Sequence, residues 1–163
     1  MHKASELINK FASYVVMVAA FVMTVIVIIQ VSCRYFLGFS IFWSEELARY
    51  LLVWITFLGG SVAFKHAQLA SINFVTDRLP EKLRAIVSLV AQLIILGFLI
   101  TATVYGFKQS FAPSVLTQVS PALRMPMMYN YLAVPISFGV MCIHCLDNLF
   151  KELSLAINGG GKA

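Results

Sequence analysis

Two cysteines and a histidine form the most chemically reactive motif of the sequence, Cys142-Ile-His-Cys145. A C-x-x-C pair can exchange disulfides when its thiols are accessible and a second thiol pair relays the electrons. The remaining cysteine is Cys33, so the sequence holds no second pair. Both thiols lie inside an apolar run, where cysteine commonly serves as a small packing residue. We favour packing, and thiol–quinone exchange is the alternative.

His144 lacks the partners that metal chemistry requires. Membrane haem needs two facing axial ligands, yet His2 lies at the N-terminus and His66 lies at the end of another apolar run. Zinc would need a fourth ligand beside His144 and the two cysteines, and the same helix offers none. The sequence also has no Gly-rich phosphate loop, no Ser/His/Asp set and no paired catalytic carboxylates. We therefore expect no metal, no cofactor and no enzymatic activity, with His144 an interfacial residue near Asp147.

Charged residues open the second apolar run, in the order Glu45, Glu46 and Arg49. Glu45 and Arg49 are four residues apart, so on a helix they share a face and can form an ion pair. Ser44 is placed to cap this helix, and the glutamates then complement its dipole. Arg34 ends the preceding run within reach of Glu46. The cluster either locks two helices or docks a partner, or its charges merely snorkel to water.

The elements that hold these residues must be membrane helices. Of the 163 residues, 60% are hydrophobic and 12% are charged, and the mean hydropathy is +0.87. A soluble domain is about 25% charged and could not bury this much apolar surface at this length. Composition thus predicts an all-α membrane protein and excludes a disordered chain, a disulfide-rich secreted module and a soluble enzyme. Four segments can cross a hydrocarbon core of about 30 Å as helices; these are residues 11–32, 42–64, 85–107 and 125–146.

Two of these segments carry further signals. The first is expected to be an uncleaved anchor, because its apolar run is longer than that of a signal peptide and no small-residue cleavage site follows. The fourth contains Pro135, which should bend the helix or leave the preceding turn loosely bonded.

The connectors between the segments also have patterns. Apolar residues recur every three or four positions over about residues 66–79, which predicts an amphipathic helix lying on the membrane surface. A shorter interfacial turn is predicted between Pro113 and Pro121. We therefore expect four transmembrane helices and one or two interfacial helices in a single integral membrane domain, residues 1–163. The periodic residues of the longer connector are Leu69, Ile72, Val75 and Leu79.

The net charge of +5 reports topology rather than a ligand. The basic residues are scattered singly between apolar runs, so nucleic acid is not an expected partner. Eight of the 12 lie in the N-terminal segment, the connector 65–84 and the C-terminal tail, and four lie in the other two connectors and adjoining helix ends. The positive-inside rule then places both termini in the cytoplasm and the Glu45/Glu46/Arg49 cluster on the outer side.

The tract from Trp43 to Tyr50 has a distinctive sequence, Trp-Ser-Glu-Glu-Leu-Ala-Arg-Tyr. It follows an Arg-aromatic pair that closes the first segment and a short aromatic-rich link. This pattern resembles the small membrane subunit, the DctQ-like Q subunit, of tripartite ATP-independent periplasmic (TRAP) transporters. The four-segment layout and the length also match. Further matching residues are Val53-Trp54, Leu58-Gly59-Gly60 and Lys65-His66.

The resemblance implies a non-catalytic scaffold that pairs with a large membrane permease subunit. That subunit would carry the substrate and sodium sites and move by an elevator-type mechanism in the bacterial inner membrane. A periplasmic substrate-binding protein would deliver an organic acid, such as a C4-dicarboxylate or a sialic acid, for sodium-coupled uptake. The alternative is a stand-alone four-span redox protein. The resemblance also implies structural or partner-contact roles for Arg34, Trp43, Glu45, Glu46 and Arg49.

We predict that the connector 65–84 and both termini are cytoplasmic. Single cysteines placed at Ser71 and at Ser114, in a chain whose three native cysteines are replaced by alanine, should react with an impermeant thiol reagent from opposite sides. In intact cells Ser114→Cys should be labelled, and Ser71→Cys should be labelled only after the membrane is opened. Labelling of Ser71→Cys in intact cells would reject this orientation.

Overall fold

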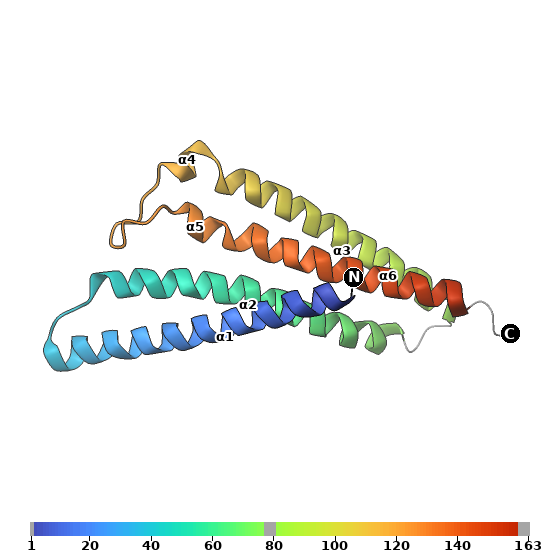
Figure 1. The fold of residues 1–163 in the computed structure, drawn as a ribbon, viewed down its shortest axis with the longest axis horizontal. Helices are drawn as coiled ribbons and strands as arrows, with labels where there is room; N and C mark the ends of the chain where they lie inside the picture. Colours follow the sequence, from blue (N-terminus) through green and yellow to red (C-terminus); the bar gives the residue numbers. More distant parts are fainter. Residues whose placement is uncertain (1, 77–80, 160–163) are drawn as a thin grey trace.

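The computed structural model is a row of four long helices, with short elements at one end (Figure 1). It describes the backbone of residues 2–76 and 81–159 and the side chains of residues 5–66 and 87–150. The prediction of an all-α protein with four potential membrane spans and a further helix is confirmed. The long helices are α1 (His2–Ser32), α2 (Phe42–Thr76), α3 (Glu81–Ser110) and α6 (Ala133–Gly159). The short elements are the π-helical turn η1 (Cys33–Leu37), α4 (Pro113–Leu116) and α5 (Met128–Tyr131).

The helices extend beyond the apolar runs that predict them. The stretches long and apolar enough to cross a membrane are Ser5–Leu37, Phe42–His66, Val87–Ser110 and Met128–Phe150. Helix α2 continues to Thr76 and so includes most of the interfacial helix expected at residues 66–79. Residues 77–80 lie outside the described part, and the location of this helix on the membrane surface stays a prediction.

The four long helices do not follow one another across the row in chain order. Helix α1 packs on α2, α2 packs on α6, and α6 packs on α3, so the last helix lies between the second and the third (Figure 1). A row buries less surface than a closed bundle. The protein exposes 10996 Å², whereas a compact protein of this mass exposes about 8,100 Å². In the most apolar stretch of α1, no residue is buried.

An aromatic cluster holds the middle of the row. Phe138 of α6 makes edge-to-face contacts with Phe57 of α2 and with Phe98 of α3, each at a ring-centroid distance of 6.1 Å. Such pairs contribute about 0.5–1.5 kcal/mol beyond the area they bury. Because Phe138 contacts an aromatic ring on α2 and another on α3, it helps to hold α6 between these two helices.

Polar contacts join the ends of the chain. The Ser5 hydroxyl of α1 hydrogen-bonds His144 Nδ1 of α6 at 2.8 Å, and both residues are buried. The side chains of Asp147 and Gln92 are buried as well. His144 is therefore enclosed between helices, which the expectation of an interfacial histidine did not include. The first and the last long helix are tied together at this end.

Helices α3 and α6 approach closely where a glycine faces a proline. A Cβ atom added at Gly106 would lie 3.1 Å from Pro135 Cβ and 3.3 Å from Pro135 Cδ. Small residues allow such approaches in membrane helix pairs. Pro135 also interrupts its own helix: α5 ends at Tyr131 and α6 begins at Ala133. The disturbed turn expected before this proline is thus present, because proline has no N–H to bond the Tyr131 carbonyl.

We predict that Gly106→Val lowers the thermal unfolding midpoint of the protein in detergent, because the added branches collide with Pro135. Overpacking of this kind costs about 1–3 kcal/mol. Gly97→Val is the matched control on the same helix, since a Cβ at Gly97 has no heavy atom within 4 Å. Equal midpoints for the two variants would contradict the close α3–α6 contact.

Candidate partner-contact site

A tight loop at residues 118–127 connects α4 to α5. The Ser120 N–H donates to the Met125 carbonyl at 2.9 Å, and the Met127 N–H donates to the Gln118 carbonyl at 3.0 Å. These antiparallel bonds close the loop at its base. Backbone N–H groups at the tip must then find acceptors elsewhere.

Glu46, near the start of α2, supplies that acceptor. Its Oε2 accepts the Ala122 N–H at 2.8 Å and the Leu123 N–H at 3.0 Å. Two successive backbone N–H groups form a small anion-binding concavity, and hydrogen bonds to a carboxylate are stronger than neutral ones. Ser120, whose hydroxyl also accepts the Leu123 N–H at 3.3 Å, is buried beside them. We call Glu46 with Ala122 and Leu123 the Glu46 latch.

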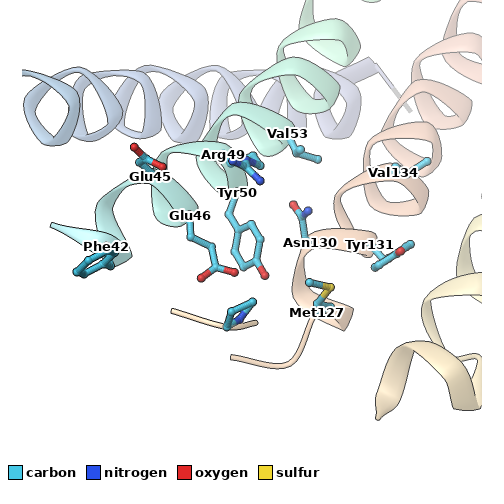
Figure 2. A pocket seen from close by; sticks show the side chains of 11 residues that line it. Phe42, Glu45, Glu46, Arg49, Tyr50, Val53, Met127, Asn130, Tyr131 and Val134 are labelled. Atoms are coloured by element: carbon cyan, nitrogen blue, oxygen red, sulfur yellow. The ribbon is translucent and has the colours of Figure 1, made fainter. Parts of the chain in front are cut away.

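An open cleft of about 560 Å³ lies beside the latch, between the start of α2 and the α5–α6 segment. Figure 2 shows Arg49 and Tyr50 reaching into it from α2, with Asn130 opposite on α5. We call it the Arg49 cleft. Its lining residues are Phe42, Glu45, Glu46, Arg49, Tyr50, Val53, Pro121, Met127, Asn130, Tyr131 and Val134.

One polar group of the Arg49 cleft has unused hydrogen-bonding capacity. Asn130 Oδ1 is shielded from solvent and has no hydrogen-bond partner among the described residues, whereas the shielded Tyr50 hydroxyl interacts with the Glu46 carboxylate. A buried polar group left unpaired costs about 1–3 kcal/mol. Arg49 is exposed and makes no ion pair within the described part of the chain. The arrangement suits recognition, because no nucleophile in the cleft is paired with a base.

Two details of the expected charge cluster are wrong. Glu45 does not pair with Arg49; its Oε1 accepts a hydrogen bond from Gln30 Nε2 of α1 at 3.0 Å, because α1 packs along this face of α2. Ser44 does not cap the helix, since α2 already begins at Phe42. The buried Ser44 hydroxyl instead donates to the Ile41 carbonyl at 2.6 Å.

Of the five residues predicted to contact a partner, three line the Arg49 cleft and two lie outside it. Glu45, Glu46 and Arg49 gather at the Arg49 cleft, but Arg34 and Trp43 do not line it. Arg34 is exposed on η1, and Glu46 bonds to the loop backbone rather than to Arg34.

Two polar residues of the cleft were missed by sequence reasoning. Tyr50 ends the Trp43 to Tyr50 tract, so its place in that tract was an available signal. Asn130 had a weaker one, as an isolated amide near the start of the fourth apolar segment.

The C-x-x-C motif is far from this cleft, between α3 and α6. Cys145 is fully buried, with its Sγ 3.8 Å from the Gln92 carbonyl oxygen. Cys142 is partly buried, with its Sγ 3.9 Å from Thr103 Oγ1. Among the residues whose side chains are described, no group of three or more His, Cys, Asp or Glu could hold a metal ion. Both cysteines occupy packing positions.

The sequence of the chain was compared with those of known proteins. The family model for the DctQ component of tripartite ATP-independent periplasmic transporters matches residues 23–155. The isethionate TRAP transporter permease protein DctMQ of Oleidesulfovibrio alaskensis is 34% identical over 115 residues, which is 69% of this chain but only 18% of that relative.

Two further relatives are nearer to this chain in length. The sialic acid TRAP transporter small permease protein SiaQ of Vibrio cholerae is 26% identical, over 82% of this chain and 76% of the relative. The ectoine TRAP transporter small permease protein TeaB of Halomonas elongata is 27% identical, over 91% and 77% respectively. With four helices able to span a membrane and a family match over most of its length, the chain belongs to the DctQ family of small TRAP transporter subunits.

Proposed function

We propose that this chain is the scaffold partner of a separate large permease subunit. The observation that carries the proposal is the relative named DctMQ, in which the part similar to this chain is only 18% of one longer polypeptide. In that relative the part similar to this chain is joined to a much larger part. In the small permease relatives SiaQ and TeaB the similar part makes up most of the polypeptide, and a subunit of that kind binds its larger counterpart through noncovalent contacts.

The surface of the row supports such lateral binding. Apolar side chains of α1 and α3 remain exposed along their spans, including Phe21, Ile28, Ile94 and Phe98. In a bilayer, helices associate through packing and a few polar contacts rather than through the hydrophobic effect. A flat row offers long faces for packing and the Arg49 cleft for polar contact.

We assign different roles to the charged residues of the site. The Glu46 latch and the Gln30–Glu45 hydrogen bond act within the chain, where they hold the outer loop and helix α1 to the start of α2. Arg49 has an exposed guanidinium and is the residue that contacts the permease. Arg34 and Trp43, outside the cleft, are proposed as further structural or contact positions.

The assembled transporter carries out sodium-coupled uptake of an organic acid delivered by a periplasmic binding protein, and this chain has no catalytic role. It lies in the inner membrane as a single domain with both termini cytoplasmic. The relatives' names mention isethionate, sialic acid and ectoine. Because these solutes differ while the small subunits are similar, we assign solute choice to the permease and the binding protein.

We predict that the affinity-tagged chain, co-expressed with the large permease, recovers it from detergent extracts. Arg49→Gln should reduce this recovery and solute uptake in proteoliposomes together, since Arg49 makes no ion pair inside the described chain. Lys108→Gln is the matched control, an exposed cation at the same end of the molecule but outside the cleft. Full recovery with Arg49→Gln would remove Arg49 from the interface, and no recovery with the wild-type chain would reject the scaffold function.

We also predict that Glu46→Ala frees the loop 118–127. Trypsin should then cleave after the exposed Arg124 faster than in the wild-type chain, because the Ala122 and Leu123 N–H groups lose their acceptor. Glu45→Ala, one residue away, breaks the bond to Gln30 and should leave cleavage at Arg124 unchanged. Equal cleavage rates in Glu46→Ala and wild type would show that the latch does not hold the loop.

A further inference from the structure

The turn between α1 and α2, residues 34–43, is the most exposed apolar part of the described chain. Phe36 is 87% exposed, Phe42 is 83% exposed and Tyr35 is 80% exposed. We call this segment the outer turn. Its exposed large apolar residues are Tyr35, Phe36, Leu37, Phe39, Phe42 and Trp43.

The apolar side chains of the outer turn point in several directions. Tyr35, Phe36 and Leu37 are consecutive residues of η1, so they are spaced about a quarter of a turn apart around its axis. The chain then reverses at Gly38, whose φ of +72° lies in the left-handed region that glycine tolerates. A protein partner would cover one side of this turn. Exposure on several sides is instead what a turn surrounded by lipid would show.

The outer turn begins where a membrane span ends. The span Ser5–Leu37 has 33 residues, which as a helix measures about 50 Å. A bilayer is about 40–45 Å thick with its headgroup layers. Even a tilted helix of this length therefore brings η1 to the headgroup layer, and the apolar surface of the turn is continuous with that of the span.

The residue types of the outer turn match that layer. Tyr and Trp concentrate where membrane meets water, because their rings are apolar and their polar ends reach water. Tyr35 and Trp43 are of this kind, and both are exposed. Arg34, also exposed and without an ion pair among the described residues, adds a positive charge at the depth of the lipid phosphates.

The geometry points to the outer turn as a lipid-binding anchor that lies in the headgroup layer, with Arg34 at the phosphates and the aromatic rings below them. The anchor fixes the depth and tilt of the α1–α2 hairpin. The anchor depends on the membrane spans and not on the permease. An experiment can therefore reject the anchor without rejecting the scaffold function, and the reverse.

Spin labels test the depth of the outer turn. Phe36→Cys and Leu37→Cys, both exposed on η1 and outside the Arg49 cleft, are each labelled in a chain without native cysteines, in proteoliposomes that contain the large permease. Collision rates with oxygen, which partitions into lipid, and with a water-soluble nickel chelate report depth. We expect both labels at headgroup depth, with measurable access to both reagents. Leu52→Cys, at an exposed position further along α2 and outside the Arg49 cleft, is the control for hydrocarbon depth and should meet oxygen only.

Two results would overturn the anchor. High nickel access with low oxygen access would place the outer turn in water. Low access to both reagents with the permease present would show that protein covers it, which makes it a docking surface for the permease. The same labels in the chain reconstituted alone separate these cases.

The native tryptophan provides a second measurement that leaves the turn unaltered. Trp54→Phe makes Trp43 the sole tryptophan of the chain, which is reconstituted without the permease. Lipids brominated near the headgroup end of the acyl chain should quench Trp43 fluorescence more than lipids brominated near the chain terminus. Equal or absent quenching by the two lipids would contradict the anchor.

Discussion

The two hydrogen bonds that Glu46 accepts from the Ala122 and Leu123 N–H groups join the two hairpins of the molecule at the end where α1 meets α2. These bonds are strong for backbone contacts, because the acceptor is a carboxylate. The Glu46 latch places an acidic side chain of α2 beneath the tip of the loop that joins α3 to the last helix. The α1–α2 hairpin and the α3–α6 hairpin are thereby joined at a point where α2 and α3 themselves scarcely touch. Pro121 and Met127, the two residues of this loop that line the Arg49 cleft, are held beside α2 in this way.

The arrangement of the helices in a row accounts for where the polar side chains lie in this apolar chain. A closed bundle could hide polar groups in a central core, but a row has no core of that kind. Its polar side chains therefore lie at helix contacts and at the two ends. Gln30 with Glu45 joins α1 to α2 near the end where these two helices connect, and Ser5 with His144 joins α1 to α6 near the opposite end. Between them, Phe138 with its two aromatic neighbours fixes the order of the middle helices.

Hydropathy predicted the four helices that are long and apolar enough to span a membrane, because a long apolar run is a local property of the sequence. Pro135 likewise predicted a disturbed turn, since its missing N–H is a local property. The partners of the charges were harder to predict. Glu46 binds two backbone N–H groups about half the chain away, and backbone groups leave no signature in a sequence. The Glu45–Arg49 spacing was compatible with an ion pair, but only the position of α1 reveals that Gln30 is the partner.

The Ser5–His144 hydrogen bond has a consequence for how the protein is made. Its two residues are separated by 139 positions, so Ser5 emerges from the ribosome with the first helix and His144 with the last. Contacts of such long sequence separation form late, after a large loop has closed. Until the last helix is synthesised, Ser5 cannot make this hydrogen bond, although α1 can already pack on α2. The start of α1 is thus among the last parts of this protein to reach its final place.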